Sequence, residues 1–184
     1  MANVARWMRL GRTGPGDLLA ACSGLALAQE SRADPIVLWA QPNAPVLGDL
    51  VRIEENQHAF VLIVPRRLAP GRISRWRAWG LAPVLATYRH FGVRAYFDDG
   101  AVRLNGRTIG ECGAQAINGC AVIASSFLPR LPEALADWPE PSLETVFRNR
   151  IEAQHGWQFD NSWPTAREQA AIADALAVED ADAR

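Results

Sequence analysis

The stretch Arg103-Leu-Asn-Gly-Arg-Thr-Ile-Gly110 carries the strongest local structural signal in the chain. Asn105 and Gly106 stand between two short runs that favour strands, and both residues tolerate the positive φ angles that a type I′ turn requires. The stretch therefore predicts a β-hairpin. Before the hairpin, the chain has a helical pattern that ends at His90-Phe-Gly92. The strand-like run Val93-Arg-Ala-Tyr-Phe97 lies between that helix and the hairpin.

Outside the hairpin, helical and extended patterns follow one another without regular alternation. Continuous apolar runs of strand length occupy residues 35–41 and 59–65, and strand patterns dominate residues 93–128. Apolar residues at helical spacing predict helices over 18–29, 72–91, 142–155 and 169–178, and we expect the tail 179–184 to be frayed. This order predicts an α+β fold, a single domain over residues 1–184 in which helices pack against one largely antiparallel sheet.

Several residues mark where these helices begin and end. Asp17 is a candidate N-cap for the first helix, and Gly92 and Gly156 are candidate stops for two others. Thr165-Ala-Arg-Glu168 has the spacing of a capping box, in which each end residue satisfies a backbone N–H near the other. His155 and His90 both fall in a last helical turn, where a cation would favour the helix dipole. We therefore interpret the two histidines as capping residues.

The composition excludes several classes of protein. With 20 acidic and 19 basic residues the formal net charge is −1, which predicts neither nucleic acid nor an anionic membrane as a partner. Every basic residue is an arginine, so a Schiff-base lysine and a lysine clamp on phosphate are both excluded. Three cysteines without CxxC spacing favour a reducing, cytoplasmic location and predict no disulfide framework or metal site.

The N-terminal thirty residues have some features of an export signal. Arg6, Arg9 and Arg12 precede an apolar run that contains Cys22. The sequence Gly14-Pro-Gly-Asp17 interrupts the approach to that run and leaves too little apolar length before the cysteine. We therefore expect a buried helix rather than a signal peptide.

The order of these segments resembles the lipoate/biotin protein ligase family over about four fifths of the chain. Three stretches besides the hairpin carry the resemblance: Asp34-Pro-Ile-Val-Leu-Trp-Ala-Gln-Pro-Asn-Ala-Pro-Val-Leu-Gly48, Ala86-Thr-Tyr-Arg-His-Phe-Gly-Val-Arg-Ala95 and Trp163-Pro-Thr-Ala-Arg-Glu168. They are similar to the family's early strand pair, to its helix ending Leu-Gly-Val-x-Ala, and to its closing Leu-Thr-x-x-Glu. The resemblance implies an acyl site beside the hairpin, with lipoate or octanoate as the ligand.

Residue by residue, the resemblance implies a set of substrate-binding positions: Asn105, Gly106, Arg107, Thr108, Gly110 and Gln115. The chain departs from the family at points that matter for chemistry. Thr108 stands where the family has its catalytic lysine, and Asp49 where a turn arginine is usual. Only residues 49–59, without a glycine, occupy the place of the family's Arg-Arg-x-Ser-Gly-Gly-Gly loop. We therefore expect no ATP-dependent adenylation and no bound ATP.

Three functional hypotheses follow from these departures. The first is a degenerate ligase-like domain that binds an acyl or lipoyl group, or a carrier protein, without ligation. The second is a cysteine-dependent octanoyl or lipoyl transferase with Cys112 as the nucleophile, for which His58 and His90 are candidate bases; Cys120 reads as a buried small hydrophobe. The third is a non-catalytic subunit or interaction module, in which Leu50 to Arg67 contact a second copy or another polypeptide across a sheet face left uncovered by the lost loop.

Overall fold

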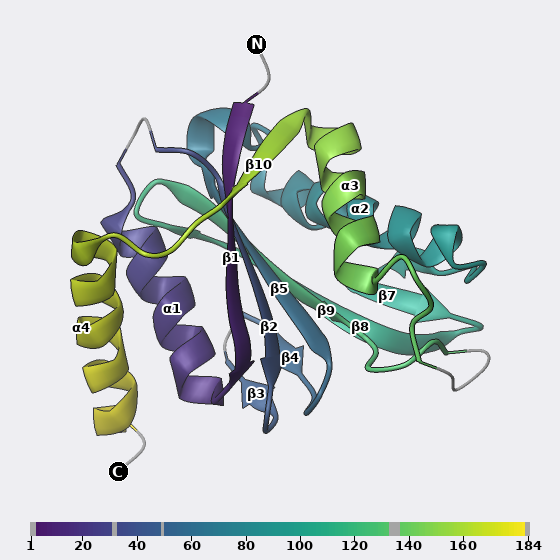
Figure 1. Ribbon diagram of the computed structural model, residues 1–184, viewed down its shortest axis with the longest axis horizontal. Helices are drawn as coiled ribbons and strands as arrows, with labels where there is room; N and C mark the ends of the chain where they lie inside the picture. The colour runs from purple at the N-terminus through teal and green to yellow at the C-terminus, as the bar shows by residue number, and fades with distance from the viewer. Residues whose placement is uncertain (1–2, 31–32, 49, 133–136, 183–184) are drawn as a thin grey trace.

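The computed structural model describes residues 3–30, 33–48, 50–132 and 137–182, and its centre is an eight-stranded sheet (Figure 1). The strand order is β10-β1-β2-β5-β9-β8-β7-β6. Their bounds are β1 Asn3–Thr13, β2 Ile36–Pro42, β5 His58–Pro65, β6 Tyr96–Asp98, β7 Ala101–Leu104, β8 Arg107–Ile117, β9 Cys120–Phe127 and β10 Trp157–Asn161. Only β1 pairs in parallel, with β2 and β10. The predicted α+β fold with a largely antiparallel sheet is confirmed.

Three two-residue turns build one half of this sheet. Asp99-Gly100, Asn105-Gly106 and Asn118-Gly119 join β6, β7, β8 and β9 in succession, and all six residues have positive φ, from 43° to 79°. Type I′ turns require that conformation at both central positions, which only glycine and small polar residues adopt at low cost. The predicted Asn105-Gly106 hairpin is confirmed, and the other two turns use the same local chemistry.

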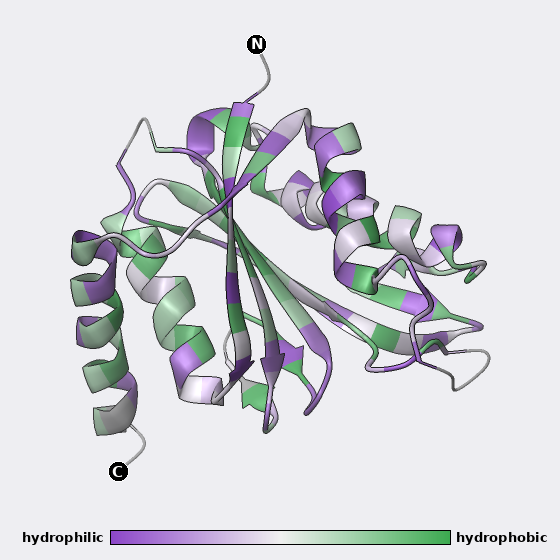
Figure 2. Ribbon diagram, in the orientation of Figure 1, coloured by the Kyte–Doolittle hydropathy of each residue, from purple (hydrophilic) through white to green (hydrophobic). Residues whose placement is uncertain are grey.

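Helices cover both faces of the sheet (Figure 1). One face packs against α2 (Trp76–His90) and α3 (Leu143–His155), and the other against α1 (Pro15–Ala28). Because successive side chains of a strand point to opposite faces, Val37 and Trp39 enter the first core whereas Leu38 enters the second. Figure 2 shows the central strands as mainly hydrophobic ribbons, in keeping with burial on both faces.

The prediction that Leu50 to Arg67 lie on an uncovered face of the sheet is wrong. β5 lies at the middle of the sheet, and its residues 59–64 are at most 2% exposed. Arg66 and Arg67 are exposed, in a short 3₁₀ helix (η1, Arg66–Leu68) that follows the strand. A second 3₁₀ turn, η2 (Ile73–Arg75), leads into α2. The polypeptide therefore leaves no bare apolar strand surface here for a partner.

A two-stranded sheet lies beside the main one. It consists of β3 (Val46–Leu47) and β4 (Arg52–Ile53), joined by residues 48–51. The main-chain oxygen of Leu50 approaches β8 so closely that a Cβ atom on Gly113 would lie 1.6 Å from it. Glycine at 113 therefore permits the small sheet to rest on β8.

The helix ends agree with the sequence in part. Ser142 caps α3 by accepting a hydrogen bond from the N–H of Thr145, and Gly156 ends it with φ of 68°. The capping box is formed: Thr165 N–H donates to Glu168 Oε2 and Glu168 N–H donates to Thr165 Oγ1. Asp17 is not the N-cap of α1, because the helix begins at Pro15 with Gly14 as its cap, and Asp17 accepts from the Gly14 N–H.

The C-terminal helix α4 (Ala166–Asp182) is longer than predicted. The segment 179–182, expected to be frayed, continues the helix, and residues 183–184 lie outside the described part of the chain. α4 packs on the outer side of α1 rather than on the sheet (Figure 1). None of the helices in the described residues is both long and apolar enough to cross a membrane.

Candidate functional site

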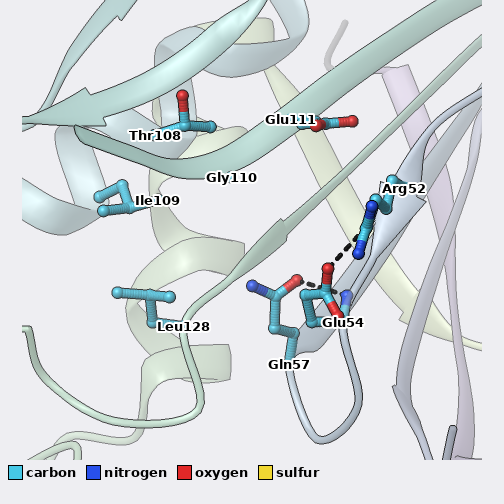
Figure 3. A pocket seen from close by; sticks show the side chains of 8 residues that line it. All are labelled: Arg52, Glu54, Gln57, Thr108, Ile109, Gly110, Glu111 and Leu128. Atoms are coloured by element: carbon cyan, nitrogen blue, oxygen red, sulfur yellow. Dashed lines mark hydrogen bonds and ion pairs between the residues drawn. The ribbon is translucent and has the colours of Figure 1, made fainter. Parts of the chain in front are cut away.

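An open pocket of about 380 Å³ lies beside the predicted hairpin strand (Figure 3). We call it the hairpin pocket. Its lining comes from β8, from β4 and the turn that follows it, and from the residue after β9: Arg52, Glu54, Gln57, Thr108, Ile109, Gly110, Glu111 and Leu128. Segments more than fifty residues apart therefore meet around one space.

Close backbone approaches hold these segments in place. The carbonyl of Leu50 sits against Gly113, which brings β4 over β8. At Gly110 a Cβ atom would lie 2.8 Å from the Ser126 carbonyl oxygen. Both glycines thus let the chain pack at distances that any larger residue would block. The shape of the pocket depends on these two positions.

Gln57 is the one uncharged amide in the pocket wall, and it is only 8% exposed. Its Oε1 accepts hydrogen bonds from the Glu54 N–H at 3.0 Å and from the hydroxyl of Ser126 at 2.8 Å. Figure 3 shows its oxygen turned towards Glu54 and its nitrogen towards the space next to Ile109 and Leu128. The amide is therefore fixed by the turn between β4 and β5.

The charges around the pocket sum to one negative charge. Glu54 pairs with Arg52, with Oε1 and Nε 2.7 Å apart, whereas the exposed Glu111 carboxylate has no hydrogen-bond or ion-pair partner among the described residues. The pocket therefore contains one positive charge, on Arg52, and two negative charges, on Glu54 and Glu111. Such a site disfavours an anionic ligand, because like charges at short range repel.

The chain is similar to known proteins at the level of structure. No known sequence family and no curated protein sequence matches the chain. Protein Ta0514 of Thermoplasma acidophilum, solved with bound lipoic acid, superposes with a TM-score of 0.79 over 95% of both chains at 11% identity. The fold is that of the lipoate and biotin protein ligases.

Other solved structures support the same conclusion. A lipoate-protein ligase A bound with ATP gives a TM-score of 0.75 at 9% identity, over 95% of this chain and 94% of that one. The biotin acetyl coenzyme A carboxylase synthetase of Helicobacter pylori gives 0.56 at 14% identity, over 96% of this chain and 81% of its own. At these identities the ligase fold is shared, and the chemistry has to be argued from the residues.

The structure brings together two of the substrate-binding positions expected in a ligase fold. Thr108 and Gly110 line the hairpin pocket. Asn105, Gly106 and Arg107 lie exposed at the tip of the hairpin, and Gln115 lies exposed farther along β8. None of these four lines the pocket. Their role in binding stays a prediction.

Cys112 lies in the core between the sheet and α2, and it is 6% exposed. Burial raises the pKa of its thiol to about 12, although the charge of Arg77 acts in the opposite direction. A nucleophilic cysteine needs the thiolate and access to its substrate. The catalytic role of Cys112 stays a prediction, and its burial weighs against it. Cys22 and Cys120 are also buried and free, and burial raises the pKa of both thiols.

Neither candidate base, His58 nor His90, has a hydrogen bond to Cys112 among the described residues. The Cys112 thiol lies 3.8 Å from the carbonyl oxygen of Gly113, and His90 Nδ1 lies 3.1 Å from Arg150 Nη2. His58 pairs with Phe127 across β5 and β9, while Cys112 pairs with Ser125 from the other side of β9. The imidazole of His58 stacks on Trp39 instead, with ring centroids 5.8 Å apart. Burial lowers the pKa of His58, against the opposing effects of the Pro129 backbone and Glu144.

A second groove, of about 400 Å³, opens where Trp39 and His58 meet the start of α3. Both of its acidic side chains are already engaged. Glu144 accepts hydrogen bonds from Trp7 Nε1 at 2.7 Å and from Arg9 Nε at 2.6 Å, and Asp137 pairs with Arg130, with Oδ1 and Nε 3.6 Å apart. Within the described residues, no three His, Cys, Asp or Glu side chains are grouped to hold a metal ion. The hairpin pocket, with unengaged polar groups, is therefore the stronger candidate site.

Six residues of the pocket wall were not among the predicted site residues: Arg52, Glu54, Gln57, Ile109, Glu111 and Leu128. None of these residues belongs to a motif that marks it as part of a site. Their positions depend on β4 crossing β8, a contact between segments far apart in the chain. The one available signal was Gly113-Ala-Gln115, whose glycine marks the crossing point.

Proposed function

We propose that this chain is an acyl-binding domain of ligase fold that recognises the acyl or lipoyl group of a lipoyl-type carrier protein and forms no acyl adenylate. The observation that carries the proposal is the hairpin pocket. It lies along β8, the strand beside which the family resemblance implies the acyl site. Its wall has both apolar side chains (Ile109, Leu128) and polar groups. Pockets that bind small molecules combine these two features.

Three features support the absence of adenylation. The chain has no lysine, and Thr108 lies where the family resemblance expects the catalytic one. Glu54 and Glu111 give the pocket a net negative charge, which opposes both a carboxylate and an adenylate phosphate. The connection between β3 and β4 spans only residues 48–51, too few for a glycine-rich loop that would enclose a phosphate.

The partner is proposed from the comparisons. The Thermoplasma acidophilum protein was solved with lipoic acid, and a bi-partite lipoate protein ligase of the same organism was studied together with its E2 lipoyl domain. A lipoyl-type domain is accordingly the carrier we propose for this chain. We place the interaction in the cytoplasm, where three buried, unpaired thiols would stay reduced.

Two measurements test the proposal. Pyrophosphate exchange with ATP and either lipoate or octanoate should not rise above a blank without enzyme. Calorimetry should show that the chain binds an octanoylated lipoyl domain with higher affinity than the same domain without the acyl group. Clear exchange would overturn the first half of the proposal, and equal binding of the two carrier forms would overturn the second.

A further inference from the structure

The hairpin pocket contains an oriented hydrogen-bond donor that the protein leaves unused. A backbone N–H can only donate, so the bond from Glu54 N–H identifies the oxygen of the Gln57 amide and places Nε2 on the other side. Within the described residues Nε2 donates to no acceptor, although the side chain is more than nine-tenths buried. Nε2 is not one of the fully buried side-chain atoms that lack a partner, so it can be reached from the pocket and is free to donate to a ligand there.

Glu111 supplies the complementary group. Its carboxylate lines the same pocket and, as noted, has no partner in the described part of the chain, whereas the other carboxylate, Glu54, is held by Arg52. An ionised carboxylate only accepts hydrogen bonds. The pocket wall thus combines one free donor and one free acceptor with the apolar side chains of Ile109 and Leu128. In Figure 3 the Gln57 nitrogen is on the side of these apolar residues, and Glu111 is on the side of Arg52.

We propose that the hairpin pocket selects the secondary amide that joins an acyl chain to an amine, and rejects the free acid. The amide carbonyl accepts from Gln57 Nε2, the amide N–H faces Glu111, and the acyl methylenes lie against Ile109 and Leu128. A free fatty acid is ionised at neutral pH and would add a second uncompensated negative charge next to Glu111. The inference rests on the proposed acyl-binding function and specifies the linkage that the pocket reads.

With this selectivity, the domain would act after the acyl group has been attached to its carrier rather than before. An acyl group acquires a secondary amide only once an amine, such as a lysine side chain, has displaced its activating group. The ligand is then the product of a ligation reaction carried out elsewhere. A domain of ligase fold that lacks a lysine would accordingly bind the acylated carrier instead of producing it.

The Gln57 side-chain NH₂ signals report directly on the pocket. In the ¹⁵N-labelled protein they are assigned by their loss in Gln57→Glu, and N-methyloctanamide and octanoate are titrated separately. We expect the amide to shift these signals and to bind at least ~10-fold more tightly than octanoate, about 1.4 kcal/mol.

Three variants separate the contribution of the Gln57 donor from that of the Glu111 charge. Gln57→Glu keeps the acceptor oxygen for Glu54 and Ser126 but removes the donor, and should weaken amide binding at least ~10-fold. Glu111→Gln should strengthen octanoate binding by a similar factor. Glu55→Gln removes the same charge from the next residue of the turn, outside the pocket, and should change neither affinity. Thermal unfolding accompanies each titration; if the buried charge destabilises Gln57→Glu, the exposed Glu111→Gln carries the test.

The outcomes distinguish this inference from the proposed function. If octanoate binds as tightly as the amide in the unmodified protein, or Glu111→Gln leaves the ratio unchanged, amide selectivity is overturned while an acyl site remains. If neither compound shifts the Gln57 signals at millimolar concentration, the acyl site itself is overturned. A ratio that favours the amide and collapses in Glu111→Gln, but not in Glu55→Gln, supports the inference.

Discussion

At the scale of single residues, burial decides the protonation of groups that the sequence leaves ambiguous. His155 ends α3 beside Gly156, a position that suits a cation. Its ring instead lies against Trp79, with centroids 4.0 Å apart, and close to Trp157. Burial lowers its pKa to about 4, although the backbone of Gln154 acts in the opposite direction. The interpretation of His155 as a charged cap is wrong, because the side chain is neutral at pH 7.

The first prediction is a loss of stability on mild acidification. The folded pKa of His155 lies below the unfolded value of ~6.5, so the unfolded chain takes up the proton first as the pH falls. This group therefore favours folding fully above ~pH 6.5 and progressively less down to ~pH 4. Between pH 7 and pH 5 we expect a decrease of about 1–2 kcal/mol in the free energy of unfolding.

Urea unfolding at the two pH values measures this decrease. His155→Phe keeps an aromatic ring between the tryptophans and removes the titration, so its stability should depend much less on pH over that range. Equal pH dependence in both proteins would show that His155 is not the responsible group.

The second prediction concerns the thiols. Cys22, Cys112 and Cys120 are at most 6% exposed, and each has a raised pKa. Since the thiolate is the reactive form, alkylation by iodoacetamide at pH 7.5 should be slow for all three in the native protein and fast in urea. Peptide mass mapping resolves the three sites. Selective native labelling of Cys112 would restore the transferase hypothesis.

At the scale of elements, the attachment of α4 depends on contacts with the N-terminal part of the chain. Arg6 on β1 donates to both carboxylate oxygens of Glu168, at 2.5 and 2.9 Å, and so ties the first turn of α4 to the sheet. Burial raises the pKa of Glu168, but the hydrogen bonds from Arg6 and Thr165 outweigh it and lower the pKa overall. Beyond that turn, the helix packs on α1 at Gly24.

The third prediction is that Gly24→Ala loosens α4. A Cβ atom at this position would lie 2.6 Å from the backbone of Ile172, and backbone cannot rotate away as a side chain can. Overpacking of this kind costs about 1–3 kcal/mol. We expect a lower melting temperature and faster proteolysis within residues 166–182. Gly71→Ala, where a Cβ would meet no atom within 4 Å, is the matched control and should behave like the parent protein.

At the scale of the whole molecule, the ligase fold extends over nearly the whole chain. Both sheet faces are covered, and the likeness to lipoate ligases spans 95% of the chain. The differences that we expect to matter for chemistry lie in the hairpin pocket and in the short β3–β4 connection. The fold is shared at 11% identity, and the binding role that we propose has to be tested on the residues of the pocket, since architecture does not fix function.

The fourth prediction is that Thr108→Lys does not create an adenylating enzyme. A lysine there would add one positive charge, but Glu54 and Glu111 would remain and no loop would enclose the phosphates. Pyrophosphate exchange with ATP and octanoate should stay at the level of a blank, as for Thr108→Ala. Exchange restored by this one change would show that neither the loop nor the pocket charge blocks the chemistry.

Several parts of the fold could be predicted because their signals are local. Asn105-Gly106 predicts its turn from the φ angles it accepts, and Thr165-Ala-Arg-Glu168 predicts its capping box from spacing. β1 and β10 were missed for the opposite reason. They are stabilised by pairing with each other, 154 residues apart at Asn3 and Trp157, and neither has a turn at its end that predicts a hairpin.

The sequence by itself determined the turns, the alternation of the central strands, the helix stops and the absence of lysine, because each depends on residues that are near neighbours or on composition alone. The tertiary structure decided which groups share a pocket and which are charged. Gln57 and Glu111 line one pocket only because Gly113 lets β4 cross β8, and His155 is neutral only because two tryptophans displace water from it. Proximity and desolvation arise between distant segments, so no local pattern encodes them.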